Sequence, residues 1–277
     1  MMTPAQNKAL GLQELAQQRT VLASSPSLLT LETTSRCNLR CVMCLHAIGG
    51  VDRPKHLDEA LTAKLSRYLG QAEAVQLHGI GEPINSPAFW ACLSDLPSPT
   101  VCESSINTNF TVINEQQMER LVASNLKIIN VSLDAATPQT YQKIRGFDFE
   151  KVLANIRMFT QKKQEAGKLF PQLYLNMTMM RSNIEEVVKF VQLAKSLNAT
   201  KACVWHLNRW PEAEMARFVV QRDDWLFDYR KEGLWNFPEL SNDWLDKAKQ
   251  EAKQLDIPFW MPHATRTYFE AEPNDSK

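Results

Sequence analysis

Short apolar runs alternate with longer segments of helical periodicity between residues 27 and 207. The strand candidates are 27–34, 73–79, 101–108, 127–134, 172–179 and 201–207. The helix candidates between them are 57–69, 86–94, 114–124, 149–166 and 183–197. Because strand–helix–strand units build parallel sheets with right-handed crossovers, the chain is predicted to be an α/β protein. Six such units predict a partial (β/α)6 barrel, and a doubly wound sheet is the competing arrangement.

Short polar residues stand at the expected helix starts. Asp58, Asn114 and Asn183 each lie at or next to the beginning of a helix candidate, where their side chains could accept hydrogen bonds from free backbone N–H groups. Gly167 and Pro171 interrupt the pattern after the helix candidate 149–166, which predicts that this helix ends there.

Polar residues also follow the expected strands, at the ends where α/β folds carry their chemistry. These segments are RCNLRCVMC (36–44), HGIGEP (78–83), NTN (107–109), SLD (132–134), Asn176 with Thr178, and His206 with Asn208. Their agreement predicts one polar rim formed by six strand ends.

Three of the six cysteines, Cys37, Cys41 and Cys44, lie within eight residues of each other. Thiolates are soft ligands that suit zinc and iron–sulfur clusters. A structural zinc site closes with four ligands, and His46 could complete a Cys3His set. A [4Fe–4S] cluster on three cysteines would instead keep one iron open, and an open position on a metal is where reactive chemistry occurs. The spacing alone leaves both sites open.

The composition sets limits on partners and compartment. Lys and Arg number 31, as do Asp and Glu, so the formal net charge is zero and gives no footprint for nucleic acid or an anionic membrane. No window has the length of a membrane span, and the N-terminus has no signal-peptide core. We therefore expect a cytoplasmic protein, in which clustered cysteines act as metal ligands or catalysts before they form disulfides.

We expect three regions: an N-terminal helical extension over 1–26, the partial barrel over 27–210, and a helical C-terminal appendage with a solvated tail over 211–277. Within the appendage, helices are expected over 223–232 and 242–253. Six of the seven tryptophans lie beyond residue 200. They could pack the appendage onto the barrel, form an aromatic wall for a substrate, or present a face to a protein partner.

The pattern Cys37-x3-Cys41-x2-Cys44 after an apolar strand resembles the signature of the radical SAM superfamily. GIGEP (79–83) resembles the second-strand motif of that family. NVSLDAATPQTYQKIRG (130–146) is similar to the fourth-strand segment of the branch that includes anaerobic sulfatase-maturing enzymes, the SPASM-type branch. Relatives in that branch often carry a further cysteine-rich domain for auxiliary clusters, whereas this chain has no cysteine beyond Cys203.

The resemblance implies a [4Fe–4S] cluster on Cys37, Cys41 and Cys44, with S-adenosylmethionine (SAM) on the open iron. It implies reductive cleavage of SAM to a 5′-deoxyadenosyl radical, which takes hydrogen from a peptide or protein side chain or from a small molecule. A reducing donor such as flavodoxin or ferredoxin would supply the electron. The alternative is a non-catalytic binding or scaffold subunit that needs a partner.

The family's cofactor contacts transfer to residues of this chain. Gly79, Gly81, Glu82 and Pro83 would approach the methionine amino group, and Thr108 follows on the third strand. Ser132 and Asp134 would bind the ribose or carboxylate region, Arg145 the SAM carboxylate, and Met43 and Leu207 the adenine.

Two residues depart from the family pattern: Met43 stands where an aromatic residue is usual, and Asn109 where glycine is common. The catalytic residue is not assigned. His206, Asp134 and Cys203 are the candidates, the last as a hydrogen donor to a substrate radical.

Overall fold

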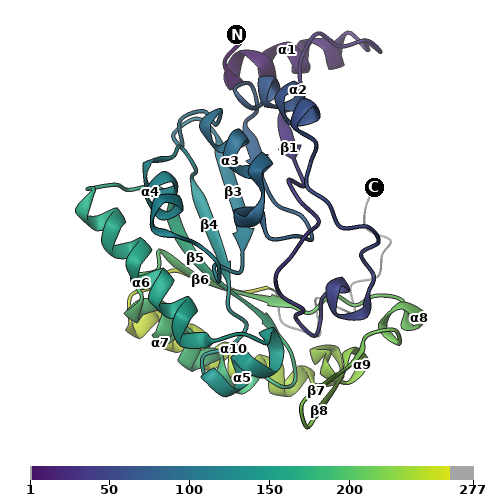
Figure 1. The fold of residues 1–277 in the computed structure, drawn as a ribbon, viewed down its shortest axis with the longest axis vertical. Coiled ribbons are helices and arrows are strands. Elements are labelled where there is room, and N and C mark those ends of the chain that lie inside the picture. Colours follow the sequence, from purple (N-terminus) through teal and green to yellow (C-terminus); the bar gives the residue numbers. More distant parts are fainter. Residues whose placement is uncertain (1, 263–277) are drawn as a thin grey trace. The chain divides into compact units, whose positions relative to one another are not determined.

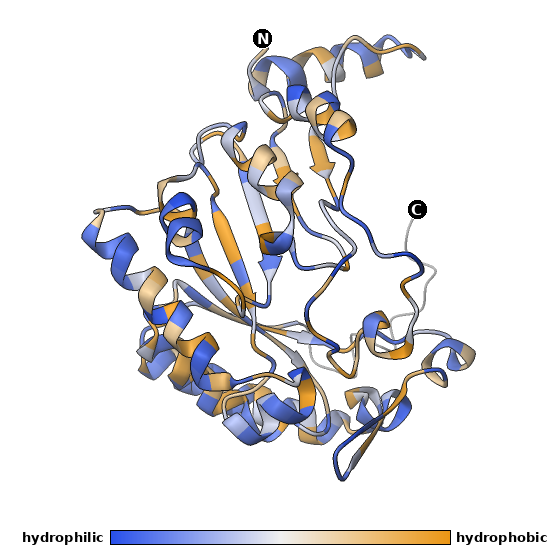
Figure 2. Ribbon diagram, viewed as in Figure 1, coloured by the Kyte–Doolittle hydropathy of each residue, from blue (hydrophilic) through white to orange (hydrophobic). Residues whose placement is uncertain are grey.

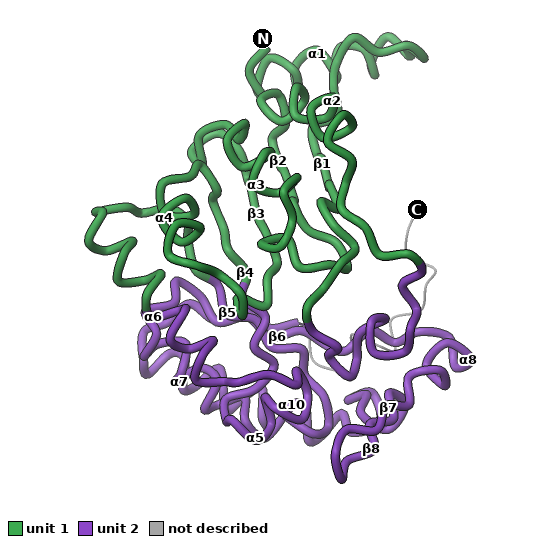
Figure 3. Tube along the Cα trace, viewed as in Figure 1, with its two compact units in different colours: residues 1–38, 53–130, 158–173 green, residues 39–52, 131–157, 174–277 purple. Residues whose placement is uncertain are grey.

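The computed structural model describes residues 2–262. The chain forms two compact units, each assembled from separate stretches (Figure 3). Unit 1 contains residues 1–38, 53–130 and 158–173, and unit 2 contains 39–52, 131–157 and 174–277. The predicted tail beyond residue 262 lies outside the described residues. None of the described helices is long and apolar enough to cross a membrane.

Unit 1 consists of parallel strands and the helices between them (Figure 1). Its elements are α1 (Pro4–Ala16), β1 (Leu28–Thr30), α2 (Glu59–Leu69), β2 (Ala74–Gln76), η2 (Pro83–Asn85), α3 (Pro87–Ser94), β3 (Glu103–Thr108) and α4 (Glu115–Ala123). In the register, Val75 of β2 pairs with Leu29 of β1 on one side and Ser104 of β3 on the other.

Unit 2 holds the later strands and the region after residue 210. Its elements are η1 (Leu45–Ile48), α5 (Pro138–Arg145), η3 (Ile184–Glu186), α7 (Val187–Ser196), β6 (Lys201–His206), α8 (Glu212–Met215), β7 (Val219–Arg222), β8 (Trp225–Asp228), α9 (Tyr229–Glu232), η4 (Leu234–Asn236), α10 (Pro238–Gln254) and β9 (Phe259–Trp260). Three elements have residues in both units: β4 (Ile128–Ser132), α6 (Phe149–Glu165) and β5 (Gln172–Met179).

The order of the seven-stranded sheet is β1-β2-β3-β4-β5-β6-β9. Successive strands are neighbours, so the order never reverses, as it would at the switch point of a doubly wound sheet. The order also has two ends, β1 and β9, so the strands do not close into a ring. This confirms the α/β fold class and the partial barrel, and β9 adds a seventh strand parallel to β6.

The strands bury one face more than the other. Along β5, Leu173, Leu175 and Met177 are fully buried, whereas the residues between them are partly exposed. This period of two is typical of a strand with one face in the core. Helices such as α6 and α10 carry both hydrophilic and hydrophobic residues, as amphipathic helices do (Figure 2).

Two of the three expected helix caps are confirmed. Asp58 accepts a hydrogen bond from Leu61 N, and Asn114 forms a reciprocal capping box with Gln117. The cap at Asn183 is wrong, because its side chain makes no capping bond and is used elsewhere. The helix α6 ends where predicted, and Gly167 follows it with φ of 61°.

The region after residue 210 is less helical than predicted. The expected helix over 223–232 is wrong: β7 and β8 form an antiparallel hairpin, and only Tyr229–Glu232 is helical. Asp223 and Asp224 sit in the turn, where Asp223 adopts φ of 51°, a conformation that aspartate tolerates better than most residues. The expected helix over 242–253 lies within the longer α10. The short helix α5 was not predicted.

Candidate functional site

None of the three clustered cysteines forms a disulfide. Cys37 belongs to unit 1, and Cys41 and Cys44 belong to unit 2. Among residues 2–262, no three side chains of His, Cys, Asp or Glu lie close enough together to hold a metal ion. Their role as cluster ligands therefore stays a prediction from spacing, and we describe the surroundings of the sulfur atoms within each unit.

In unit 1 the carboxylate of Glu82 lies between the ends of β2 and β3. It accepts hydrogen bonds from Thr108 Oγ1 (2.6 Å), Asn109 N (2.7 Å) and Ile84 N (3.2 Å), and the residue is only 3% exposed. A buried carboxylate is tolerated when several donors compensate for the lost water. In this arrangement Glu82 fixes the two strand ends relative to each other.

Asn109 extends this contact to the first cysteine. Its Nδ2 donates to Cys37 Sγ at 3.9 Å and to Asn38 Oδ1 at 3.1 Å. Its Oδ1 accepts from Thr111 N (3.0 Å) and Thr111 Oγ1 (2.6 Å). The departure from glycine at this position thus places an amide donor beside a predicted cluster ligand.

The glycines of the second-strand motif pack closely inside unit 1, Gly81 against backbone atoms and Gly79 against a flexible side chain. A Cβ atom on Gly81 would collide with the backbone carbonyls of Thr34 and Arg36. A Cβ on Gly79 would collide with the side chain of Glu32. Neither glycine has a positive φ, so close approach and not backbone conformation explains them. That this loop also approaches the methionine amino group remains a prediction.

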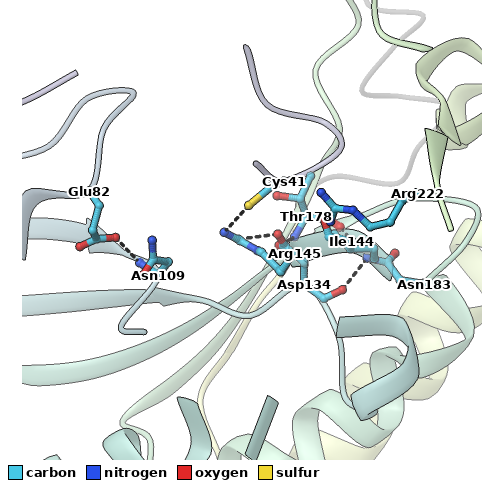
Figure 4. A network of polar contacts seen from close by, with 9 residues as sticks. All are labelled: Cys41, Glu82, Asn109, Asp134, Ile144, Arg145, Thr178, Asn183 and Arg222. Carbon is cyan, nitrogen blue, oxygen red and sulfur yellow. Dashed lines mark hydrogen bonds and ion pairs between the residues drawn. The ribbon is translucent and has the colours of Figure 1, made fainter. Parts of the chain in front are cut away.

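In unit 2 the guanidinium of Arg145 lies between an acid and a cysteine (Figure 4). Its Nη2 pairs with Asp134 Oδ2 at 2.5 Å, and its Nη1 donates to Cys41 Sγ at 3.5 Å. Burial by itself would lower the pKa of Arg145, but attraction to Asp134 and then to Cys41 raises that pKa above its ordinary value. Arg145 therefore stays charged next to a predicted cluster ligand.

Asp134 is held from three sides at the end of β4. Its Oδ1 accepts from Thr178 N at 2.7 Å, and its backbone adopts φ of 60°. Asn183 Nδ2 donates to the carbonyls of Asp134 and Thr178, both at 2.9 Å, while its Oδ1 accepts from Met180 N at 2.7 Å. Asn183 is fully buried, so it ties the end of β4 to the end of β5 (Figure 4). Asn183 was predicted from the sequence only as a helix cap, so this role was missed.

The structure thus pairs two predicted SAM-binding residues, Asp134 and Arg145, with each other. Asp134 is 1% exposed and uses both carboxylate oxygens inside the protein. In this arrangement its geometry is that of a residue that positions Arg145. Ser132 is the last residue of β4 and is partly exposed, and its predicted contact with SAM remains a prediction.

Arg222 is a further site residue that the sequence did not indicate. From β7 its Nη1 donates to the carbonyls of Lys143 (3.1 Å) and Ile144 (3.0 Å) at the C-terminal end of α5, and its Nη2 donates to the carbonyl of Arg40. A cation at a helix C-terminus is favourable because the last carbonyls lack partners. Arg222 therefore ties α5 to the segment before Cys41 (Figure 4). The sequence did not indicate Arg222 because a helix was expected over 223–232 and no strand was expected before it.

The loop between Cys41 and Cys44 is also anchored by apolar contacts. Val42 is fully buried in a cluster that includes Ile144 of α5 and Phe227 of β8, and its backbone N donates to Ile144 O at 3.0 Å. Trp225 and Trp235 pack against the same cluster. Packing of the appendage therefore accounts for part of the tryptophan enrichment.

Unit 2 also contains a cavity of about 850 Å³. It is lined by Met43, Leu45, Thr178, Trp205, His206, Leu207, Asn208, Trp210, Glu214, Phe218, Tyr229, Trp260 and Pro262. The structure thus brings together Met43 and Leu207, the predicted adenine contacts, with the candidate His206. It also brings three tryptophans to one wall. Cys203 is buried on β6, and burial raises the pKa of its thiol to about 11, so this thiol keeps its proton at neutral pH.

These surroundings fit an iron–sulfur cluster with a carboxylate-bearing ligand. Donors such as Asn109 and Arg145 beside cysteine sulfur are the contacts that tune such clusters. In addition, Arg145 Nε is buried and has no hydrogen-bond partner among the described residues, so it can donate to an added acceptor.

Comparison with known proteins gives a consistent result. The family model described as Radical SAM superfamily matches residues 31–194. AdoMet-dependent heme synthase from Methanosarcina barkeri is 26% identical over 223 residues, which cover 76% of this chain and 60% of that protein. Mycofactocin maturase MftC from Mycobacterium tuberculosis is 29% identical over 184 residues, which cover 64% of this chain and 44% of that protein. The chain therefore spans about half the length of these relatives.

Among solved structures, Streptococcus suis SuiB bound to the precursor peptide SuiA has a TM-score of 0.65. It is 16% identical, and the match covers 94% of this chain and 54% of that one. At this identity the likeness concerns the fold.

Proposed function

Because this chain belongs to the radical SAM superfamily, whose members use a [4Fe–4S] cluster and SAM, we propose that it cleaves SAM reductively and removes a hydrogen atom from a substrate. The observation that carries the proposal is the pattern Cys37-x3-Cys41-x2-Cys44 with hydrogen-bond donors placed on two of its sulfurs. Three thiolates would hold the cluster, and its fourth iron would remain open for SAM.

A cluster held by Cys37, Cys41 and Cys44 would supply, from an external reductant, the one electron needed to cleave SAM to methionine and the 5′-deoxyadenosyl radical that would take the substrate hydrogen. The protein's own residues would hold and orient these groups. Arg145 would stabilise negative charge on Cys41 and offer Nε to the SAM carboxylate. Asp134 would hold Arg145, and Met43 and Leu207 would border the adenine.

The substrate is proposed to be a peptide or protein side chain, with a small molecule as the other class. Two similarities support a peptide: a maturase among the relatives and a fold match to SuiB bound to a precursor peptide. A flavodoxin or ferredoxin is proposed as the electron donor. The partial barrel over 27–210, with the appendage after it, is proposed as the catalytic region.

The test is reductive cleavage of SAM. The full chain is purified and reconstituted with iron and sulfide without oxygen, dithionite and SAM are added, and 5′-deoxyadenosine is quantified by mass spectrometry. We expect product from the wild type and none from a variant carrying Cys37→Ala, Cys41→Ala and Cys44→Ala. Cys102→Ala, a buried cysteine outside the motif, is the matched control and should keep the cluster.

Two outcomes would contradict the proposal. A reconstituted protein without iron would remove the cluster on which it depends. A full cluster without 5′-deoxyadenosine would favour the alternative, a non-catalytic subunit that needs a partner.

A further inference from the structure

The aromatic wall of the unit 2 cavity has no role in the chemistry proposed above. Trp205, Trp210 and Trp260 line the cavity and are 46%, 48% and 38% exposed. Large apolar rings left in water are unfavourable, and a cavity lined by them is a typical ligand site. The cavity volume, about 850 Å³, lies in the range of pockets that hold small ligands.

The polar atoms of this wall are largely used inside the protein. Trp205 Nε1 donates to Asn176 Oδ1 at 2.9 Å, and Tyr229 Oη donates to the carbonyl of Asn208 at 2.8 Å. The rings of Trp205 and Trp260 lie with centroids 3.9 Å apart at an angle of 34°. The wall therefore offers ring faces and edges to a ligand, which favours stacking.

The wall is also rigidly supported. Trp205 stands on β6, paired in register with Thr178 of β5, and Trp260 stands on β9, paired with Cys203 of β6. Side chains on paired strands lose little further freedom when a ligand binds. An aromatic platform on paired strands is therefore suited to orienting a flat group.

The charged groups that line the cavity restrict the class of ligand that it can bind. No Lys or Arg is found among the lining residues that the structure describes, and Glu214 is their one carboxylate. Glu214 is already paired with Arg217 at 2.8 Å. A phosphate or a group of carboxylates would find no lysine or arginine in this lining, whereas a neutral aromatic group would find stacking partners and the polar side chains of Thr178 and Asn208.

We propose that this cavity binds the aromatic side chain of a peptide substrate, a proposal that rests on the proposed function and names its substrate class. The volume exceeds one aromatic ring, so neighbouring peptide residues fit beside it. Stacking on the three tryptophans would hold the ring, and Thr178 and Asn208 would bond to the peptide backbone. Nucleotides and carboxylate-rich tetrapyrroles are disfavoured by the lining charge.

The test is binding by the full chain, loaded with its cluster, first without SAM and then with saturating SAM, and in both cases without a reductant. The probes are N-acetyl-Gly-Tyr-Gly-amide, its Leu counterpart, and GTP, and dissociation constants come from NMR titration of the probe. We expect the Tyr peptide to bind at least about threefold more tightly than the Leu peptide, because aromatic pairs add to simple burial. GTP should bind more weakly than either.

Substitutions of the tryptophans test whether the peptide binds at the aromatic wall. Trp210→Leu and Trp205→Leu should each weaken binding of the Tyr peptide by about three- to tenfold, and Trp205→Phe should restore most of it. Trp244→Leu, on α10 and outside this cavity, is the matched control and should leave binding unchanged. Circular dichroism checks that each variant is folded.

Three results would overturn the inference: equal binding of the Tyr and Leu peptides, tighter binding of GTP, or loss of Tyr-peptide binding when SAM is added, which would make the wall an adenine site. None of these measurements requires SAM cleavage. Binding without 5′-deoxyadenosine formation would thus refute the proposed function alone, and cleavage without selective binding would refute the cavity assignment alone.

Discussion

The two units solve the same problem in different ways: each buries a carboxylate at the end of a strand. In unit 1, Glu82 is compensated by one hydroxyl and two backbone N–H donors. In unit 2, Asp134 is compensated by a backbone N–H and by the cation of Arg145. Hydroxyl and backbone donors hold Glu82 in place, whereas the arginine neutralises Asp134 and brings a positive group to Cys41. The comparison teaches that the second carboxylate positions a cation beside a predicted cluster ligand.

Removing the cation of Arg145 should have the largest effect on stability of the substitutions that test this comparison. Arg145→Leu would leave the carboxylate of Asp134, which is 1% exposed, buried and unpaired. We expect the free energy of unfolding to fall by about 3–5 kcal/mol, measured by urea denaturation, as for other broken buried pairs. The exposed pair of Arg217 with Glu214 is the control, and Arg217→Leu should cost less than about 1 kcal/mol. Equal losses in the two variants would show that burial does not set the difference.

Asn183 tests whether Asp134 also depends on its neutral anchor. Asn183→Leu keeps the side-chain volume but removes bonds to two carbonyls and to Met180 N. We expect a loss of about 1–3 kcal/mol in the same denaturation experiment, because buried backbone groups lose their partners. Asn242→Leu on α10, a partly exposed position, serves as the matched control. Unchanged stability of Asn183→Leu would contradict the anchoring role.

Glu82→Gln sharpens the unit 1 side of the comparison. The amide keeps one acceptor but turns an N–H donor toward Thr108 or Asn109, whose groups already donate. We expect a loss of about 1 kcal/mol, smaller than for Arg145→Leu because no charge is left unpaired. Asp58→Asn is the matched control, because it also replaces a carboxylate by an amide but does so at a helix cap where both residues are favourable. A loss for Glu82→Gln as large as for Arg145→Leu would reject the distinction.

Sequence reasoning recovered what depends on local pattern. The six strands, the helices between them other than α5, and two caps follow from periodicity and from short polar side chains, which act over a few residues. It missed Asn183 and Arg222, because their partners are backbone carbonyls that only the tertiary fold brings near. It also placed β8 in a helix over 223–232 and did not predict β7, since a four-residue strand has too few residues to show its period. The tryptophan wall was kept as an alternative, and only the pairing of β6 with β9 gathers Trp205 and Trp260.

Asp228 and Glu232 are a second pair of carboxylates that can be compared, through the pH dependence of stability. We expect this effect to be the smallest of those predicted. Asp228 receives two bonds from Arg230, both 3.0 Å, and this side-chain hydrogen bond lowers the pKa of Asp228 below its ordinary 3.8. Glu232 accepts one bond from Ser182 N at 2.8 Å, and burial raises the pKa of Glu232 above its ordinary 4.5. The carboxylate that is hydrogen-bonded to an arginine and the carboxylate for which burial outweighs the attraction to Arg181 thus shift in opposite directions.

The direction in which each carboxylate changes stability with pH follows from its proton binding in the folded and unfolded chains. Folded Asp228 releases its proton more readily than the unfolded chain, so its stabilisation is present at neutral pH and is lost as the pH falls through the acid range. Folded Glu232 holds its proton more tightly, so its contribution is full at low pH and is lost as the pH rises above 4.5. Against wild type in urea denaturation from pH 3 to 7, Asp228→Asn should therefore lose relative stability as the pH rises, and Glu232→Gln should gain it. Parallel slopes for the two variants would mean that the hydrogen bonds from Arg230 and the burial of Glu232 do not set the opposite pH responses of these carboxylates.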